Sequence, residues 1–162
     1  MLTIAIILSV VILAGVFVYI RNKELNLLEE GKIIKRNDRF YDEEEIFTVK
    51  NATYEKVKEE INLMDFSGID VEVYPDSDDQ EAIVFKSGGG WNALLMVVDK
   101  KDDVTVYNLK ITIYNSTSGG LAYYPMEMNV LFTSIEKLFL KLDPNTRVET
   151  REIKRKTKTK LF

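Results

Sequence analysis

The side chains in this sequence that could carry out chemistry are carboxylates, lysines and hydroxyls, because the chain contains no histidine and no cysteine. These absences exclude Ser-His-Asp and Cys-His catalysis, thiol redox chemistry and the usual zinc sites. An enzyme built from the remaining alphabet would need tuned carboxylates, a lysine or an oxygen-ligated Mg²⁺. No motif indicates such a constellation. We therefore expect no catalytic residues, no cofactor and no metal.

One acidic segment could bind Ca²⁺, since Asp76, Asp78 and Gln80 begin like an EF-hand loop. The resemblance ends at the sixth position, which is Glu81 instead of glycine, and at the twelfth, which is Ser87 instead of glutamate. The pattern favours a solvated turn between strands.

The glycine run 88–90 could form a backbone nest for phosphate. However, no Lys-Ser/Thr pair follows it, and the next element has the pattern of a strand instead of a helix. A hairpin turn before Trp91 is the favoured interpretation, because glycine adopts positive φ without strain.

Several aromatic side chains could line a pocket between a sheet and a long helix. Aromatic residues on strands are more often packed in the core, so core packing is the competing interpretation. The candidate pocket residues are Trp91, Tyr107, Tyr114, Tyr123 and Tyr124.

The C-terminal segment is a basic tail that could lie on anionic lipid, where each basic residue near the surface contributes about 1 kcal/mol. A solvated basic end is the alternative. The body of the chain is acidic, with nine basic and twenty acidic residues between 42 and 143, so nucleic acid is an unlikely partner. The tail residues that would contact lipid are Lys154, Arg155, Lys156, Lys158, Lys160 and Phe162.

Residues 1–20 contain no charged side chain and form an apolar run of the length that spans a bilayer. A cleaved signal would have basic residues before the run and small residues at its end, whereas here Tyr19 and Ile20 lead directly into Arg21. We therefore predict an uncleaved transmembrane anchor. Basic residues after the run, including Lys23, Lys35 and Arg36, predict a single-pass membrane protein with its soluble domain in the cytoplasm.

After the anchor, residues 21–45 are expected to form a juxtamembrane helix, continuing to about Glu30 and stopping at Gly31, followed by a charged linker. Residues 46–153 are the predicted soluble domain, and 154–162 the basic tail. Within the domain we expect a short strand at 46–49, a helix from about 53 to 64, strands at 69–74, 82–86, 91–98 and 104–114, a long helix from Pro125, and a last strand at 146–153. A register slip is expected near Asn108.

An antiparallel meander with one helix before it and a long helix after it predicts a two-layer α+β domain, with the long helix packed on one face of the sheet. A helix-grip or a ferredoxin-like arrangement would fit. Functionally, the sequence predicts a membrane-anchored cytoplasmic module that binds a protein or a lipid surface. The alternative is a carrier or sensor of an apolar small ligand held between the long helix and the sheet.

Overall fold

The computed structural model of the chain describes residues 2–66, 68–75 and 81–153. It divides the chain into two compact units, Met1–Lys35 (unit 1) and Arg36–Phe162 (unit 2). Each unit is described by itself below.

Unit 1 is a single long helix, α1 (Leu2–Glu29), followed by a short turn. Its 28 residues correspond to about 42 Å, more than the hydrocarbon thickness of a bilayer. From Ala5 to Glu29 the helix is long and apolar enough to cross a membrane. The helix ends at Glu29, one residue earlier than expected, and Gly31 follows it with a φ of 66°, which allows Lys32 N to bond Leu27 O at 2.8 Å.

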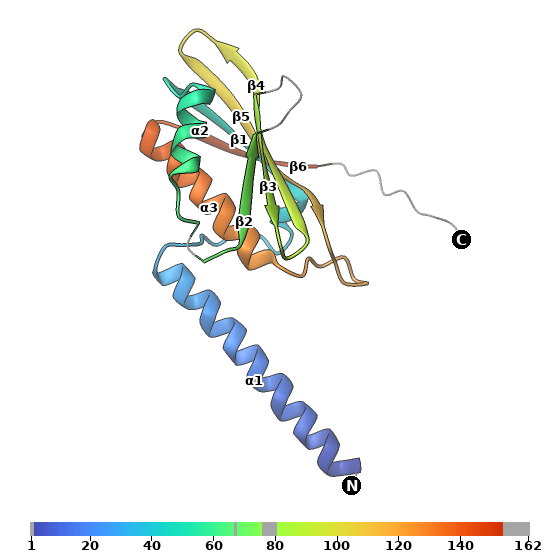
Figure 1. Cartoon of the computed structure of the whole chain (residues 1–162). Helices are drawn as coiled ribbons and strands as arrows, with labels where there is room; N and C mark the ends of the chain where they lie inside the picture. Colours follow the sequence, from blue (N-terminus) through green and yellow to red (C-terminus); the bar gives the residue numbers. More distant parts are fainter. Residues whose placement is uncertain (1, 67, 76–80, 154–162) are drawn as a thin grey trace, which may run out of the picture. The chain divides into compact units, whose positions relative to one another are not determined.

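Unit 2 contains a six-stranded, wholly antiparallel sheet in the order β2-β3-β4-β5-β1-β6 (Figure 1). Strands β2 to β5 form a meander, while β1 inserts between β5 and the edge strand β6. The strands are β1 (Glu43–Lys50), β2 (Val71–Pro75), β3 (Ala82–Ser87), β4 (Trp91–Lys101), β5 (Val104–Tyr114) and β6 (Arg147–Glu152).

Three helical segments accompany these strands, one before the first strand and two between strands. The 3₁₀ turn η1 (Phe40–Asp42) leads into β1, α2 (Tyr54–Asn62) follows β1, and α3 (Pro125–Leu142) follows β5. Thr53 caps α2, since its Oγ1 accepts a bond from Lys56 N at 3.4 Å. The prediction of an α+β domain with a long helix on one face of the sheet is confirmed.

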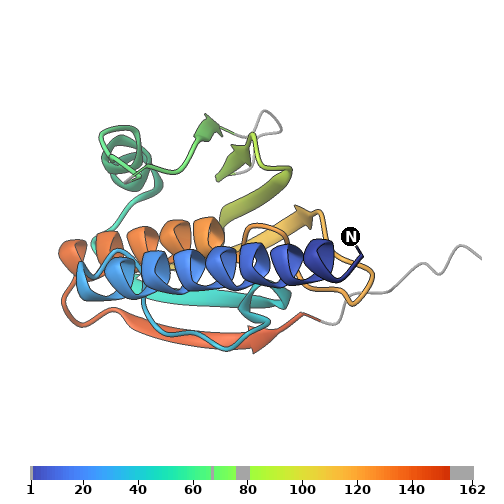
Figure 2. The same ribbon diagram turned by 90° about the horizontal axis from the view of Figure 1, so that it is seen from below.

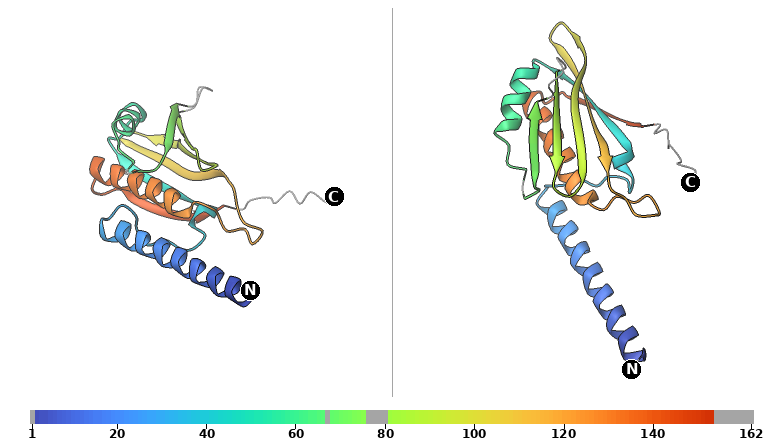
Figure 3. Two further views of the ribbon diagram at one scale, coloured as in Figure 1. Left: turned by 60° about the horizontal axis from the view of Figure 1, so that its bottom comes forward. Right: turned by 45° about the vertical axis from the view of Figure 1, so that its right-hand side comes forward.

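The sheet curves strongly, so that α3 lies in its concave face between β1 on one side and β3 on the other (Figures 2 and 3). The position of β1 between β5 and β6 resembles the order of a ferredoxin-like β-α-β-β-α-β unit whose central hairpin has become a four-stranded meander. Unit 2 therefore combines a sheet that curves around its long helix with a ferredoxin-like strand order.

A register shift lies near Asn108, as expected: Val97 pairs with Tyr107 and Asp99 with Val106, so the extra residue is Val98 on β4. A second shift lies between Asn92 and Ala93, where the extra residue, Thr112, is on β5. On β5, Val106 faces the outer side of the sheet, whereas Tyr107 and the positions two and four further on face α3.

The core lies between α3, α2 and the concave face of the sheet, and aromatic side chains dominate it. Phe139 stacks against Phe47 at 4.7 Å and against Tyr107 at 4.8 Å between ring centroids. All three are at most 1% exposed. This packing holds α3 against β1 and β5.

Unit 2 begins at Arg36, ten residues before the domain boundary expected from the sequence. Phe40 and Tyr41 are buried, and their rings contact Phe132 at 5.7 Å and Tyr114 at 5.0 Å. The charge-dense stretch predicted as a linker therefore contributes two core side chains, because η1 turns them inward.

The edge strand β6 is highly charged. Arg147 and Arg151 both pair with Glu149, at 2.9 and 3.1 Å. These three side chains occupy alternate positions and share the convex side of the sheet, while Val148 packs against the core.

Candidate functional site

The most unusual polar feature of unit 2 is the buried guanidinium of Arg36, whose side chain is only 6% exposed. It donates five hydrogen bonds. Nε and Nη2 reach Glu45 Oε1 at 3.1 and 2.8 Å, Nη1 reaches Asn129 Oδ1 at 3.0 Å and Thr133 Oγ1 at 3.2 Å, and Nη2 also reaches Glu136 Oε2 at 3.0 Å. We call these five residues the Arg36 cluster.

The cluster is built from three elements. Arg36 comes from the segment that enters unit 2, Glu45 from β1, and the other three from α3. On β1, Glu45 alternates with Phe47 and Val49, so its carboxylate points to the concave face with the core residues. On α3, the spacing 129, 133 and 136 places the three polar side chains on one face of the helix.

Aromatic rings border the guanidinium. Its central carbon lies 6.0 Å from the ring centroid of Phe40 and 5.7 Å from that of Phe132, within the range of cation–π attraction. The charge is therefore held between two carboxylates and two rings, away from water.

Glu45 is the member of the cluster whose ionised form is disfavoured by burial. Burial raises the pKa of its carboxyl to about 7, and the opposing attraction of Arg36 reduces this increase without cancelling it. Its Oε2 is buried and has no hydrogen-bond partner among the residues that the structure describes. Glu45 thus changes charge near neutral pH, which is a property that the sequence alone assigns to no residue here.

The cluster is suited to holding the chain in place and not to reacting. A guanidinium has five N–H donors, and all five are used by side chains of unit 2, so none is left for an anion. In the described ranges, no three His, Cys, Asp or Glu side chains are grouped so that they could hold a metal ion. We assign the cluster the role of fixing the point at which the chain enters unit 2.

Two of the predicted pocket residues lie in the core. Trp91 is fully buried, and its Nε1 donates to Glu127 Oε2 at 3.2 Å. Tyr107 is 1% exposed, its hydroxyl donates to Ala52 O at 2.7 Å, and burial raises its pKa. Tyr114, at the end of β5, donates to Asp42 Oδ1 at 2.7 Å.

The other two, Tyr123 and Tyr124, lie on the surface, 59% and 42% exposed. They belong to the loop between β5 and α3. The structure therefore separates the five predicted residues: Trp91 and Tyr107 lie inside the core, Tyr114 packs against it, and Tyr123 and Tyr124 face solvent. The space between α3 and the sheet is occupied by aromatic side chains, including Phe47, Phe85 and Phe139.

The proposed lipid-contacting residues Lys154, Arg155, Lys156, Lys158, Lys160 and Phe162 lie outside the described residues. The acidic segment 76–80 lies outside them as well.

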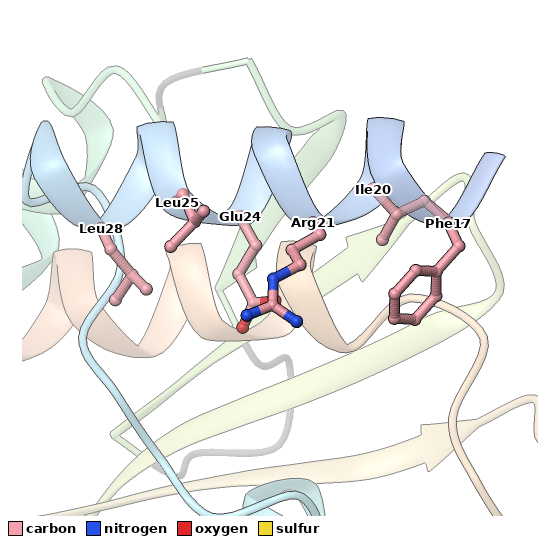
Figure 4. A pocket seen from close by; sticks show the side chains of 6 residues that line it. All are labelled: Phe17, Ile20, Arg21, Glu24, Leu25 and Leu28. Carbon is pink, nitrogen blue, oxygen red and sulfur yellow. The ribbon is translucent and has the colours of Figure 1, made fainter. Parts of the chain in front are cut away.

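On α1, six side chains line a shallow hollow along one face of the helix (Figure 4). Two of them, Arg21 and Glu24, are charged and lie one turn apart in the middle of an otherwise apolar face. The six residues are Phe17, Ile20, Arg21, Glu24, Leu25 and Leu28. The six positions follow the i, i+3, i+4 spacing of a single helical face.

Sequence reasoning missed the Arg36 cluster, because Arg36 stands in a charge-dense stretch that has the composition of a linker. A signal was present on β1. Glu45 has the same strand parity as Phe47 and Val49, and an acidic residue at an inward-facing position requires a buried cationic partner.

No family model matches the chain, and neither a curated protein nor a solved structure matches it.

Proposed function

We propose that this protein is a membrane-anchored binding module, in which α1 holds unit 2 at a cytoplasmic membrane surface where it engages a protein or lipid partner. The observation that carries the proposal is α1, an exposed apolar helix long enough to cross a bilayer. The basic residues that follow its apolar part favour the cytoplasmic side, as the positive-inside rule predicts.

The character of unit 2 supports a binding role instead of a catalytic one. The buried guanidinium of Arg36 is saturated by internal partners, and the two carboxylates of that cluster are bound to it. Its surface, by contrast, has solvent-facing apolar side chains at Leu121, Tyr123 and Tyr124. Such residues are enriched where proteins meet partners or the membrane interface.

Membrane insertion and topology can be tested with a single introduced cysteine, since the chain has none of its own. Val98 is 48% exposed on unit 2 and suits the purpose as Val98→Cys. We expect the variant to resist alkaline extraction from membranes. We also expect a membrane-impermeant maleimide to label it in inside-out vesicles and not in intact cells.

Labelling in intact cells would place unit 2 outside, and extraction by alkali would exclude the anchor. Partner binding is tested separately by placing a photo-crosslinking amino acid at Tyr123, with Val98 as the matched exposed control. A protein or lipid adduct that forms at Tyr123 and not at Val98 is expected. Equal or absent crosslinking at both positions would contradict a binding surface there.

A further inference from the structure

The loop between β5 and α3 presents apolar side chains on an ordered frame. Residues 115–124, which we call the apolar loop, fold as a small hairpin with a bridge between Ser116 and Ala122. Thr117 N donates to Leu121 O at 2.9 Å, and Tyr123 N donates to Asn115 O at 3.1 Å. The exposure of its side chains therefore results from a fixed conformation.

Three large side chains of this loop face solvent: Leu121 is 53% exposed, Tyr123 59% and Tyr124 42%. Ile113, at the end of β5, is 59% exposed and adjoins them in sequence. In the described part of unit 2, the other large exposed apolar side chains come one each from the C-cap of α2, from β2, from β4 and from α3. The apolar loop itself contains no charged residue. Several large apolar side chains exposed on one ordered loop are a candidate contact surface.

The apolar loop lies beside the segment through which the chain enters unit 2. A Cβ atom added to Gly120 would lie 3.6 Å from Nη2 of Arg39. Tyr114, which precedes the loop, bonds Asp42 at 2.7 Å. Figure 1 shows the loop at the end of the sheet opposite to the β4–β5 turn. The loop thus lies beside the segment with which unit 2 begins.

The connection is short. Six residues separate Glu29, the last residue of α1, from Arg36, the first residue of unit 2. Fully extended, they span about 25 Å. Residues 21–29 continue α1 beyond the uncharged run and add about 14 Å of helix, which is less than this extended span. Since the Arg36 cluster fixes the entry point, a bilayer crossed by residues 1–20 remains within reach of the apolar loop. A tether of this length also gives an effective concentration in the millimolar range, so a weak affinity is sufficient.

We propose that the apolar loop contacts the headgroup region of the bilayer that α1 crosses, with Leu121, Tyr123 and Tyr124 entering the interface. Tyrosine is enriched at this depth, because its ring is apolar and its hydroxyl remains hydrated. Arg39 lies next to the loop; its side chain is 60% exposed and pairs with Asp42, and the remaining N–H groups of its guanidinium can donate to lipid phosphate.

A second copy of the chain is a less suitable occupant. A stable protein interface buries about 800 Å² on each partner, more than three side chains provide. Lipid contact needs no such area when the anchor already supplies most of the membrane affinity. The inference rests on the proposed function, in which α1 crosses a membrane.

The test uses the full chain with Leu121→Cys, labelled with an environment-sensitive fluorophore and reconstituted into phosphatidylcholine–phosphatidylglycerol liposomes. Val98→Cys, on the β4 end far from the loop, is the matched control. We expect a blue-shifted emission at position 121 and loss of that emission when lipids with a shallow nitroxide quencher are included. The label at position 98 should keep water-like emission and should not be quenched.

The result that overturns the proposal is water-like, unquenched emission at position 121 in liposomes that retain the protein. A blue shift that grows with protein density and is not quenched by lipid would equally reject it, and would identify self-association. Tyr123→Cys provides an independent position in case Leu121→Cys disturbs the hairpin. Flotation of the liposomes separates the two hypotheses: protein that does not float contradicts the anchor, whereas floating protein with an unquenched label contradicts the loop contact alone.

Discussion

Arg36 donates two hydrogen bonds to a single oxygen of Glu45, from Nε at 3.1 Å and from Nη2 at 2.8 Å, and leaves the other oxygen of that carboxylate without a described partner. The first residue of unit 2 is thereby bound to the first long strand of its sheet. Because Glu136 accepts from the same guanidinium, α3 is included in the attachment. Any force transmitted along the chain from the anchor reaches unit 2 at this point.

Replacing Arg36 with methionine should strongly destabilise unit 2. The substitution keeps an apolar stem but leaves Glu45 and Glu136 without their cation, and loss of one partner of a buried ion pair costs about 3–5 kcal/mol. Urea denaturation followed by fluorescence of the single tryptophan, Trp91, measures the change. Arg39→Met is the control, because its pair with Asp42 is exposed and should contribute less than about 1 kcal/mol. Similar losses for both variants would contradict the assigned role of the cluster.

The stability of unit 2 should depend on pH through Glu45. Its pKa is about 7 in the folded protein against an ordinary 4.5, so the folded state binds the additional proton. Stability is then highest below about pH 4.5 for this group and falls as the pH rises to about 7, by about 3 kcal/mol. Denaturation midpoints across this interval should decrease in the native chain and change much less in Glu45→Gln.

The pH dependence from Asp143 has the opposite sign and another range. Hydrogen bonds from the backbone N–H groups of Lys50 and Asn145 lower its pKa below the ordinary 3.8. Its stabilising contribution is therefore lost only as the pH falls into that acidic region.

The prediction for Glu45 is tested between pH 4.5 and 7. If the denaturation midpoint changes with pH by the same amount in the native chain and in Glu45→Gln, that prediction is refuted.

Phe139→Ala should remove the central packing of α3. The ring contacts Phe47 and Tyr107 and is fully buried, so its removal leaves a cavity and costs about 3–5 kcal/mol. Calorimetry or thermal circular dichroism would measure the loss. The neighbouring Leu140→Ala is the control: Leu140 is 39% exposed, and we expect less than half the effect. A larger loss at position 140 would mean that α3 is rotated relative to this description.

Gly90→Ala should destabilise the β3–β4 turn. The residue has φ of 82°, and an added Cβ would collide with the side-chain amide of Asn115. The left-handed backbone costs about 1 kcal/mol with a side chain present, and the terminal amide of Asn115 would have to move aside. Gly119→Ala is the matched control, because the nearest atom to its added Cβ, Thr117 Oγ1, is 3.8 Å away. Equal denaturation midpoints in the two variants would contradict this geometry.

Much of the fold could be predicted because its signals are local. Hydrophobic periodicity and the turn residues place β5 and the start of α3 at Pro125 without error, since each depends on neighbours along the chain. The position of β1 between β5 and β6 could not be predicted, because strand order depends on contacts between residues up to about a hundred positions apart. The same limit applies to Arg36, whose partners on α3 are 93 to 100 residues away.

The aromatic residues illustrate a different limit. Trp91 and Tyr123 are both large aromatic residues that carry one polar group, but Trp91 is fully buried and Tyr123 is 59% exposed. Their environments differ because β4 turns Trp91 toward α3, whereas the hairpin of the apolar loop carries Tyr123 away from the core. A pattern on one strand therefore predicts burial more reliably than aromatic type alone.

The charges on β6 have a consequence for the protein at high copy number. In the proposed function, copies of the chain anchored in one membrane would share a plane and a common orientation, which makes sideways encounters between sheet edges frequent. An edge strand with unpaired backbone groups would then invite aggregation by strand addition. The alternating Arg147, Glu149 and Arg151 are charged and hydrated, so pairing of two such edges requires desolvation of six ionised side chains. Neutral residues at these three positions would let neighbouring copies extend the sheet from one molecule into the next.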